Sequence, residues 1–138
     1  MTREEKELLL KDLCGRLLYG VKVDVSRVEE WKQLTLTPFI LSNYYDDIEK
    51  IKPYLRPMSS MTEEEFELLK QYSGLEYDQL DLAEFPNNHK CLDFYLSEVP
   101  SYVVVLVFDW LNAHHFDYRG LISMGLALEA SEDMYKTD

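Results

Sequence analysis

The chain contains few of the residues that dominate fibrous, low-complexity or disulfide-bonded proteins. Its 138 residues include five glycines, five prolines and two cysteines. So few glycines and prolines exclude a collagen-like or low-complexity chain, and the apolar fraction of 46% is that of a globular protein. Cys14 and Cys91 lie far apart in the sequence, and we expect both to be free thiols that pack as small hydrophobes in a reducing compartment. The sequence also allows a disulfide between them.

Long apolar runs are missing as well. The longest, residues 103–108, has six residues, whereas a membrane-spanning helix needs roughly 20. Residues 1–12 are charged and contain only the short apolar run 8–10, which is shorter than the apolar core of about 7–15 residues in a secretory signal. We therefore expect a cytoplasmic protein without a membrane partner.

Basic residues are scarce in the second half of the chain. Residues 1–60 contain ten acidic and ten basic side chains, whereas residues 61–138 contain 16 acidic and four basic ones. The net charge of −12 therefore arises entirely after residue 60. Because proteins bind phosphate backbones through Lys and Arg, we expect this half to make no direct contact with nucleic acid. Its acidity serves solubility or steers the chain toward a partner with a basic surface.

Two segments contain the start signals of helices. Thr2 and Thr62 are each followed, at the third helical position, by a glutamate in the spacing of a capping box. Gly15 and Gly74 are placed to end these helices in a left-handed conformation. The spacing therefore predicts one helix between Thr2 and Gly15 and a second between Thr62 and Gly74.

Strand periodicity appears between the two predicted helices. Residues 21–25 and 34–37 alternate apolar and polar side chains, and we expect the second strand to continue past Pro38 through residues 39–41. A further strand is expected early in residues 48–58. These segments predict a small antiparallel sheet that packs against the first helix.

Residues 99–114 are compatible with two structures. Their valines favour a strand, but the apolar residues also fall on one helical face, and the unbroken length favours a helix. We predict a helix here, followed by a short helix from Asp117 to Met124 that Gly125 closes. The fold predicted for residues 1–138 is therefore a single α+β domain with a mainly helical acidic C-terminal half.

Four residues are the weak candidates for a metal site. His89 and Cys91 form a His-x-Cys pair, and His114 and His115 are adjacent. Structural zinc sites usually combine two motifs such as Cys-x2-Cys and His-x3-5-His, and that spacing is absent. Adjacent helical residues also point about 100° apart, so His114 and His115 are better explained as the end of a helix. We predict no metal and no cofactor.

Catalytic motifs are absent from the sequence. It contains no glycine-rich phosphate loop, no nucleophile elbow and no metalloprotease helix motif. We therefore assign no catalytic residue and expect a protein that is not an enzyme. A small enzyme or metal-binding protein that uses His89, Cys91, His114, His115 or Asp117 is the alternative.

Tyrosine, in contrast, is abundant, with ten residues. Tyr combines apolar area with a polar tip and is enriched at protein interfaces. Tyr72, Tyr77, Tyr95 and Tyr102 lie among the carboxylates of the second half, and we take them as candidate binding residues. Partial exposure is the ordinary state of tyrosine and is the competing interpretation.

Three segments of the chain are familiar together. They are residues 1–14 (MTREEKELLLKDLC), 52–64 (KPYLRPMSSMTEE) and 109–122 (DWLNAHHFDYRGLI). With these segments, which cover under a third of its length, the chain resembles a group of small uncharacterised acidic proteins of gut anaerobes and their phages and mobile elements. The resemblance implies a link to phage or prophage biology, and it implies no activity, cofactor or site residue.

The leading functional hypothesis is a non-catalytic protein that binds another protein with a basic surface. It depends on the segregated negative charge, the many tyrosines and the absence of catalytic motifs. A sharper form of it is a mimic of nucleic acid that occupies a basic binding site. A structural or assembly protein of a mobile element is the remaining alternative.

Overall fold

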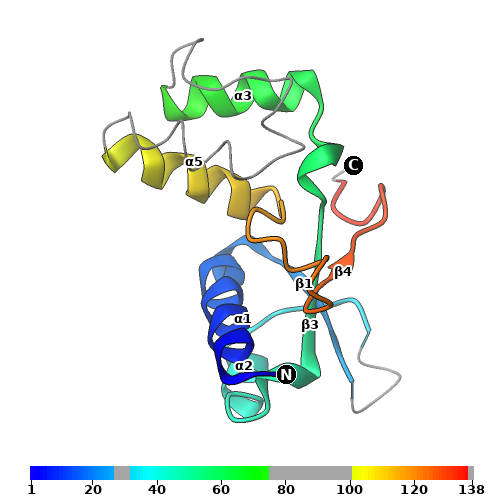
Figure 1. Cartoon of the computed structure of the whole chain (residues 1–138). Coiled ribbons are helices and arrows are strands. Elements are labelled where there is room, and N and C mark those ends of the chain that lie inside the picture. Colours follow the sequence, from blue (N-terminus) through cyan, green and yellow to red (C-terminus); the bar gives the residue numbers. More distant parts are fainter. Residues whose placement is uncertain (27–31, 75–100, 137–138) are drawn as a thin grey trace. The chain divides into compact units, whose positions relative to one another are not determined.

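The computed structural model describes residues 1–26, 32–74 and 101–136, and the chain divides into two compact units (Figure 1). Unit 1 comprises Met1–Arg56 and Leu121–Asp138, and unit 2 comprises Pro57–Gly120. The described part of unit 1 contains helices and a four-stranded sheet, and that of unit 2 contains a pair of packed helices. The predicted α+β fold class is confirmed.

The first helix, α1 (Arg3–Arg16), begins where the sequence predicts. Thr2 Oγ1 accepts a hydrogen bond from the Glu5 N–H at 3.1 Å, and the Glu5 carboxylate accepts one from the Thr2 N–H at 3.0 Å. These bonds favour the ionised carboxylate and lower the pKa of Glu5. The predicted end at Gly15 is wrong, because the helix continues to Arg16 and the first left-handed residue is Gly20, with φ of 72°.

The inner face of α1 buries an ion pair beside its leucines. Asp12 and Arg16 lie one turn apart, both side chains are 0% exposed, and Arg16 Nε donates to Asp12 Oδ2 at 2.8 Å. Leu9 and Leu13 lie on the same side and belong to the core of unit 1. Cys14 points outward as an exposed free thiol, so the prediction that it is buried is wrong.

The sheet of unit 1 has the strand order β2-β1-β3-β4. Its strands are β1 (Lys22–Val25), β2 (Leu34–Thr35), β3 (Ile51–Leu55) and β4 (Leu128–Glu129). β1 pairs antiparallel with β2 and β3, whereas β4 runs parallel to β3. The sheet is therefore mixed instead of purely antiparallel, because a segment from near the C-terminus supplies its fourth strand (Figure 1).

Alternation along β1 and β3 separates two faces of the sheet. The valines of β1 and the aliphatic residues of β3 are buried and share one core cluster with the leucines of α1. Pro53 lies inside β3, opposite Val23, and the pairing of β3 with β4 begins only at Tyr54. The N–H that Pro53 lacks is therefore not needed for the ladder to β4.

The strand predicted to continue past Pro38 is wrong, because these residues form α2 (Pro38–Asn43). Thr37 is the N-cap, and its Oγ1 accepts from the Ile40 N–H at 3.2 Å. Pro38 occupies the first helical position, where its missing N–H costs nothing and its fixed φ suits the helix. The Thr-Pro pair thus starts a helix where the alternation of residues 34–37 ends.

Tyr135 joins the C-terminal segment to the sheet. Its hydroxyl donates to the Tyr54 carbonyl at 2.7 Å and accepts from the Lys22 N–H at 2.8 Å. Lys22 and Tyr54 come directly beyond Val23 and Pro53, the last pair of the β1–β3 ladder, so the hydroxyl bridges the two strands just past the end of that ladder. Lys22 Nζ adds a hydrogen bond to the Met134 carbonyl at 3.1 Å.

Unit 2 contains α3 (Glu63–Ser73) and α5 (Ser101–Ala113), preceded by a 3-10 turn at Met58–Ser60. The helix predicted within residues 99–114 is confirmed as α5. Its valines 103 and 107 pack with Trp110 in the core of unit 2 and do not form a strand. No described helix has the combined length and apolarity that crossing a membrane requires.

The short helix predicted from Asp117 to Met124 is wrong. This segment forms successive turns, and the Leu126 N–H donates to the Leu121 carbonyl at 3.0 Å. Gly120 has φ of 77°, a left-handed conformation that interrupts an α-helix. Gly125 has the same φ, but it ends no helix, so its predicted role as a closing glycine is wrong as well.

The capping box of α3 matches its prediction and can be tested directly. Thr62 Oγ1 accepts from the Glu65 N–H, and Glu65 Oε1 accepts from the Thr62 N–H, both at 3.1 Å. We expect Thr62→Ala to lower the free energy of unfolding by about 1 kcal/mol, measured by urea denaturation. Ser59→Ala, at an exposed serine outside the cap, serves as the control. A T62A variant as stable as S59A would contradict the capping role.

Candidate functional site

Exposed apolar side chains in the described part of unit 2 lie on both of its helices. The large ones are Leu68 and Tyr72 on α3, and Tyr102 and Val105 on α5. Each pair is spaced three or four residues apart and therefore shares one face of its helix. The other faces of α3 and α5 meet in the core of unit 2.

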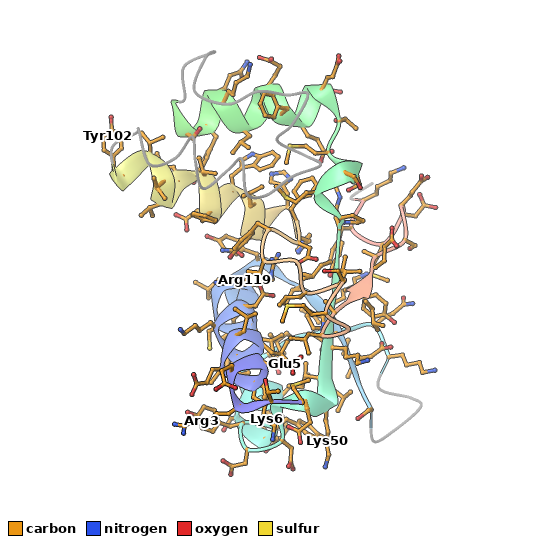
Figure 2. The ribbon with its side chains drawn as sticks, viewed as in Figure 1. Arg3, Glu5, Lys6, Lys50, Tyr102 and Arg119 are labelled. Carbon is orange, nitrogen blue, oxygen red and sulfur yellow. The ribbon has the colours of Figure 1, made fainter. Side chains whose placement is uncertain are left out.

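Two of the four predicted binding tyrosines lie at one end of this helix pair. Figure 1 shows α3 and α5 as antiparallel neighbours. Tyr72 is the next-to-last residue of α3, and Tyr102 is the second residue of α5. Figure 2 shows Tyr102 at the N-terminal end of α5. Their side chains are 52% and 68% exposed, whereas Tyr77 and Tyr95 lie outside the described residues.

The outer face of α3 combines these apolar groups with negative charge. Glu64, Leu68 and Tyr72 follow each other at intervals of four, so they form one line along the helix, and all three are exposed. We call this line the α3 face. Glu63 beside it is exposed as well. The face therefore presents two apolar side chains next to carboxylates.

The lysine of α3 is turned away from that face. Lys70 is only 7% exposed. Its Nζ lies 2.8 Å from Glu67 Oε1 and 5.0 Å from the centroid of the Phe66 ring, in cation–π contact. The cation is therefore held beside Glu67 and Phe66, with little of its side chain at the surface.

The excess of negative charge predicted for residues 61–138 falls mainly in unit 2. This unit has twelve acidic and three basic residues, a net charge of −9, whereas the rest of the chain has −3. The described carboxylates after residue 60 are thus divided between two units. The α3 face belongs to the more acidic one.

The histidines are placed by α5 and the turn after it. The His114 ring stacks on Trp110, with centroids 4.0 Å apart and planes inclined by 26°. His115 has φ of 65° and is 8% exposed. Among the residues that the structure describes, no three His, Cys, Asp or Glu side chains are arranged to hold a metal ion. His89 and Cys91 lie outside these residues.

Sequence reasoning missed the aliphatic members of this surface, Leu68 and Val105. The helical spacing of α3 contained a signal for Leu68, because Phe66, Leu69 and Ser73 define the core side and Leu68 falls off it. Val105 stands in a run of valines, but the helical spacing of Val103, Val107 and Trp110 on the core side already leaves it off that side.

Comparison with protein-family models, with curated proteins and with solved structures found no match to this chain. Its function is therefore inferred from the residues and their arrangement.

Proposed function

We propose that this protein is a non-catalytic binding protein, and that it engages another protein through the α3 face. The observation that carries the proposal is the exposure of Leu68 and Tyr72, at 48% and 52%, side by side on an acidic helix. Large apolar side chains gathered at the surface and bordered by polar ones are typical of interaction sites. Tyr is also among the residues that dominate binding energy at interfaces.

The charge of the α3 face defines the chemistry of the partner. Glu63 and Glu64 are exposed there, and Lys70 is held against the core. A complementary surface would place Lys or Arg around a shallow apolar patch. Such complementarity speeds association and makes it sensitive to salt. Origin in a phage or mobile element, as the resemblance of residues 1–14, 52–64 and 109–122 implies, is part of this proposal.

Serine substitutions on the α3 face test the proposal. We expect the double variant Leu68→Ser/Tyr72→Ser to weaken capture of the partner about 30-fold, because each side chain contributes about 1 kcal/mol or more at an interface. The measurement is quantitative affinity purification from a lysate of the source organism, followed by titration of the captured protein. Raising the salt concentration should release the partner from the unmodified chain.

The chain offers a matched control for this experiment. Phe39 on α2 is 71% exposed and belongs to unit 1. Phe39→Ser therefore removes an exposed apolar side chain elsewhere, and it should leave capture unchanged. If F39S and L68S/Y72S retain the same proteins in the same amounts as the unmodified chain, the α3 face is not the binding site.

A further inference from the structure

Unit 1 contains a pocket that is lined by residues of β1, β3 and β4 and of the segments beside them. The pocket has a volume of about 430 Å³, within the roughly 300–1,000 Å³ of small-molecule sites. Its lining includes Asp24 and Lys52, which face each other in the β1–β3 register. Both residues alternate with buried neighbours, so their side chains point away from α1. Leu128 of β4 adds an apolar wall.

Three lysines reach this pocket from different parts of the chain. Lys50 precedes β3, Lys52 lies within it, and Lys32 comes just before β2. Lys50 Nζ lies 3.5 Å from Asp47 Oδ2. Lys32 and Lys52 are exposed and form no ion pair with any described residue. Figure 2 shows Lys50 at the foot of β3, close to the N-terminal part of α1.

The two carboxylates of the pocket, those of Asp24 and Glu49, differ in how they are engaged. Asp24 Oδ2 accepts from the Tyr54 hydroxyl, and Oδ1 accepts from the Gln33 N–H, both at 2.8 Å. Glu49 Oε2 lies 3.8 Å from Lys6 Nζ, an ion pair without a hydrogen bond. Asp24 is thus fully engaged and Glu49 is paired only loosely, whereas the ammonium groups of Lys32 and Lys52 remain available to an incoming anion.

We propose that this pocket binds a small organic phosphate. Lysine recognises phosphate as a point charge, and a phosphate monoester carries about two negative charges at neutral pH. The double charge of a phosphate ligand matches the two available ammonium groups better than the single charge of a carboxylate ligand does. The organic part of the ligand lies against Leu128. The site is separate from the α3 face, and its existence does not depend on the proposed protein-binding function.

The test uses phenyl phosphate as the probe and the full chain labelled with ¹⁵N. At neutral pH and constant ionic strength, we expect saturable shifts of the backbone amide signals of Asp24, Lys52 and Leu128. The variant Lys32→Gln/Lys52→Gln should bind at least about tenfold more weakly, since it removes two nearby charges. Both lysines are exposed, and unchanged signals elsewhere will show that the variant is folded.

Two controls make the outcome decisive. Lys11→Gln changes an exposed lysine on α1, outside the pocket, and should bind phenyl phosphate like the unmodified chain. Benzoate carries the same ring with one charge and should bind more weakly than phenyl phosphate. The proposal is overturned if the shifts do not saturate, if K32Q/K52Q binds as well as K11Q, or if benzoate binds equally well.

Discussion

Replacing Asp12 with alanine is expected to lower the free energy of unfolding by about 3–5 kcal/mol. The carboxylate lies 2.8 Å from Arg16 Nε, and both side chains are 0% exposed. Without Asp12, the guanidinium of Arg16 stays in the interior and loses the charge that compensates its desolvation. Urea denaturation measures the effect, and hydrogen exchange of the β1 and β3 amides reports on unit 1 specifically.

Two further variants separate the buried charge from helix propensity. Arg3 and Glu7 form an ion pair of the same i,i+4 spacing on α1, but their side chains are 88% and 58% exposed. Glu7→Ala should therefore change stability by no more than about 0.5 kcal/mol. The double variant Asp12→Leu/Arg16→Met removes both charges and should recover most of the loss. An Asp12→Ala variant as stable as Glu7→Ala would show that the pair contributes little.

Tyr135→Phe is expected to cost about 1–3 kcal/mol of stability. The hydroxyl bridges the Lys22 N–H and the Tyr54 carbonyl. Removing it leaves one backbone donor and one acceptor without that partner at the end of the β1–β3 ladder. Tyr45→Phe, at a tyrosine that is 61% exposed, is the control and should be nearly neutral. Thermal and urea denaturation of both variants provide the comparison.

The same hydroxyl makes the protein sensitive to alkali. Burial raises the pKa of Tyr135 to about 12. Burial, followed by the hydrogen bond to Asp24, raises the pKa of Tyr54 to about 12 as well. Tyrosines of the unfolded chain ionise near pH 10, so the unfolded state releases these protons first. The stability that both groups contribute is complete below pH 10 and decreases as the pH rises toward 12.

Measuring the free energy of unfolding between pH 9 and 12 tests this expectation. The decrease in this free energy with rising pH should be shallower in Tyr135→Phe, because one tyrosine with a raised pKa is removed. It should be shallower again when Tyr54→Phe is added. Tyr45→Phe should keep the decline of the unmodified chain. If Tyr135→Phe shows an unchanged decline, ionisation of Tyr135 is not linked to unfolding.

The parts of the fold that were predictable have short-range causes. The capping boxes at Thr2 and Thr62 join residues three positions apart, so their spacing is visible in the sequence. The αL end of α3 at Gly74 follows from the same kind of local rule. The helical face of α5 was also readable, because it repeats within the segment.

The errors occurred where local signals competed or distant segments met. Thr37 and Pro38 start a helix, and this signal prevailed over the alternation just before it. Gly120 takes a left-handed conformation that interrupts the helix predicted from Asp117. The parallel strand β4 joins the sheet from more than 70 positions away, and no periodicity within residues 126–129 specifies that partner.

The surface residues also divide into those that the sequence identified and those that only the packing of the chain placed. Composition identified Tyr72 and Tyr102 as candidates, and both side chains are exposed. The sequence could not show that Lys70 lies against Phe66, because a lysine in an amphipathic helix usually points outward. It also could not bring Lys32 and Lys52 to one pocket, since that placement follows from the pairing of β1 with β2 and β3.

The sequence by itself determined the α+β class, the starts of α1 and α3, the helical state of α5, and an excess of acid after residue 60. Each of these follows from spacing within a few residues or from composition. Only the tertiary structure decided that the ion pair of α1 is buried and that the Tyr135 hydroxyl binds the sheet. It also decided which apolar side chains remain exposed on the α3 face. Burial and strand pairing depend on contacts between distant segments, and those contacts arise only when the chain packs.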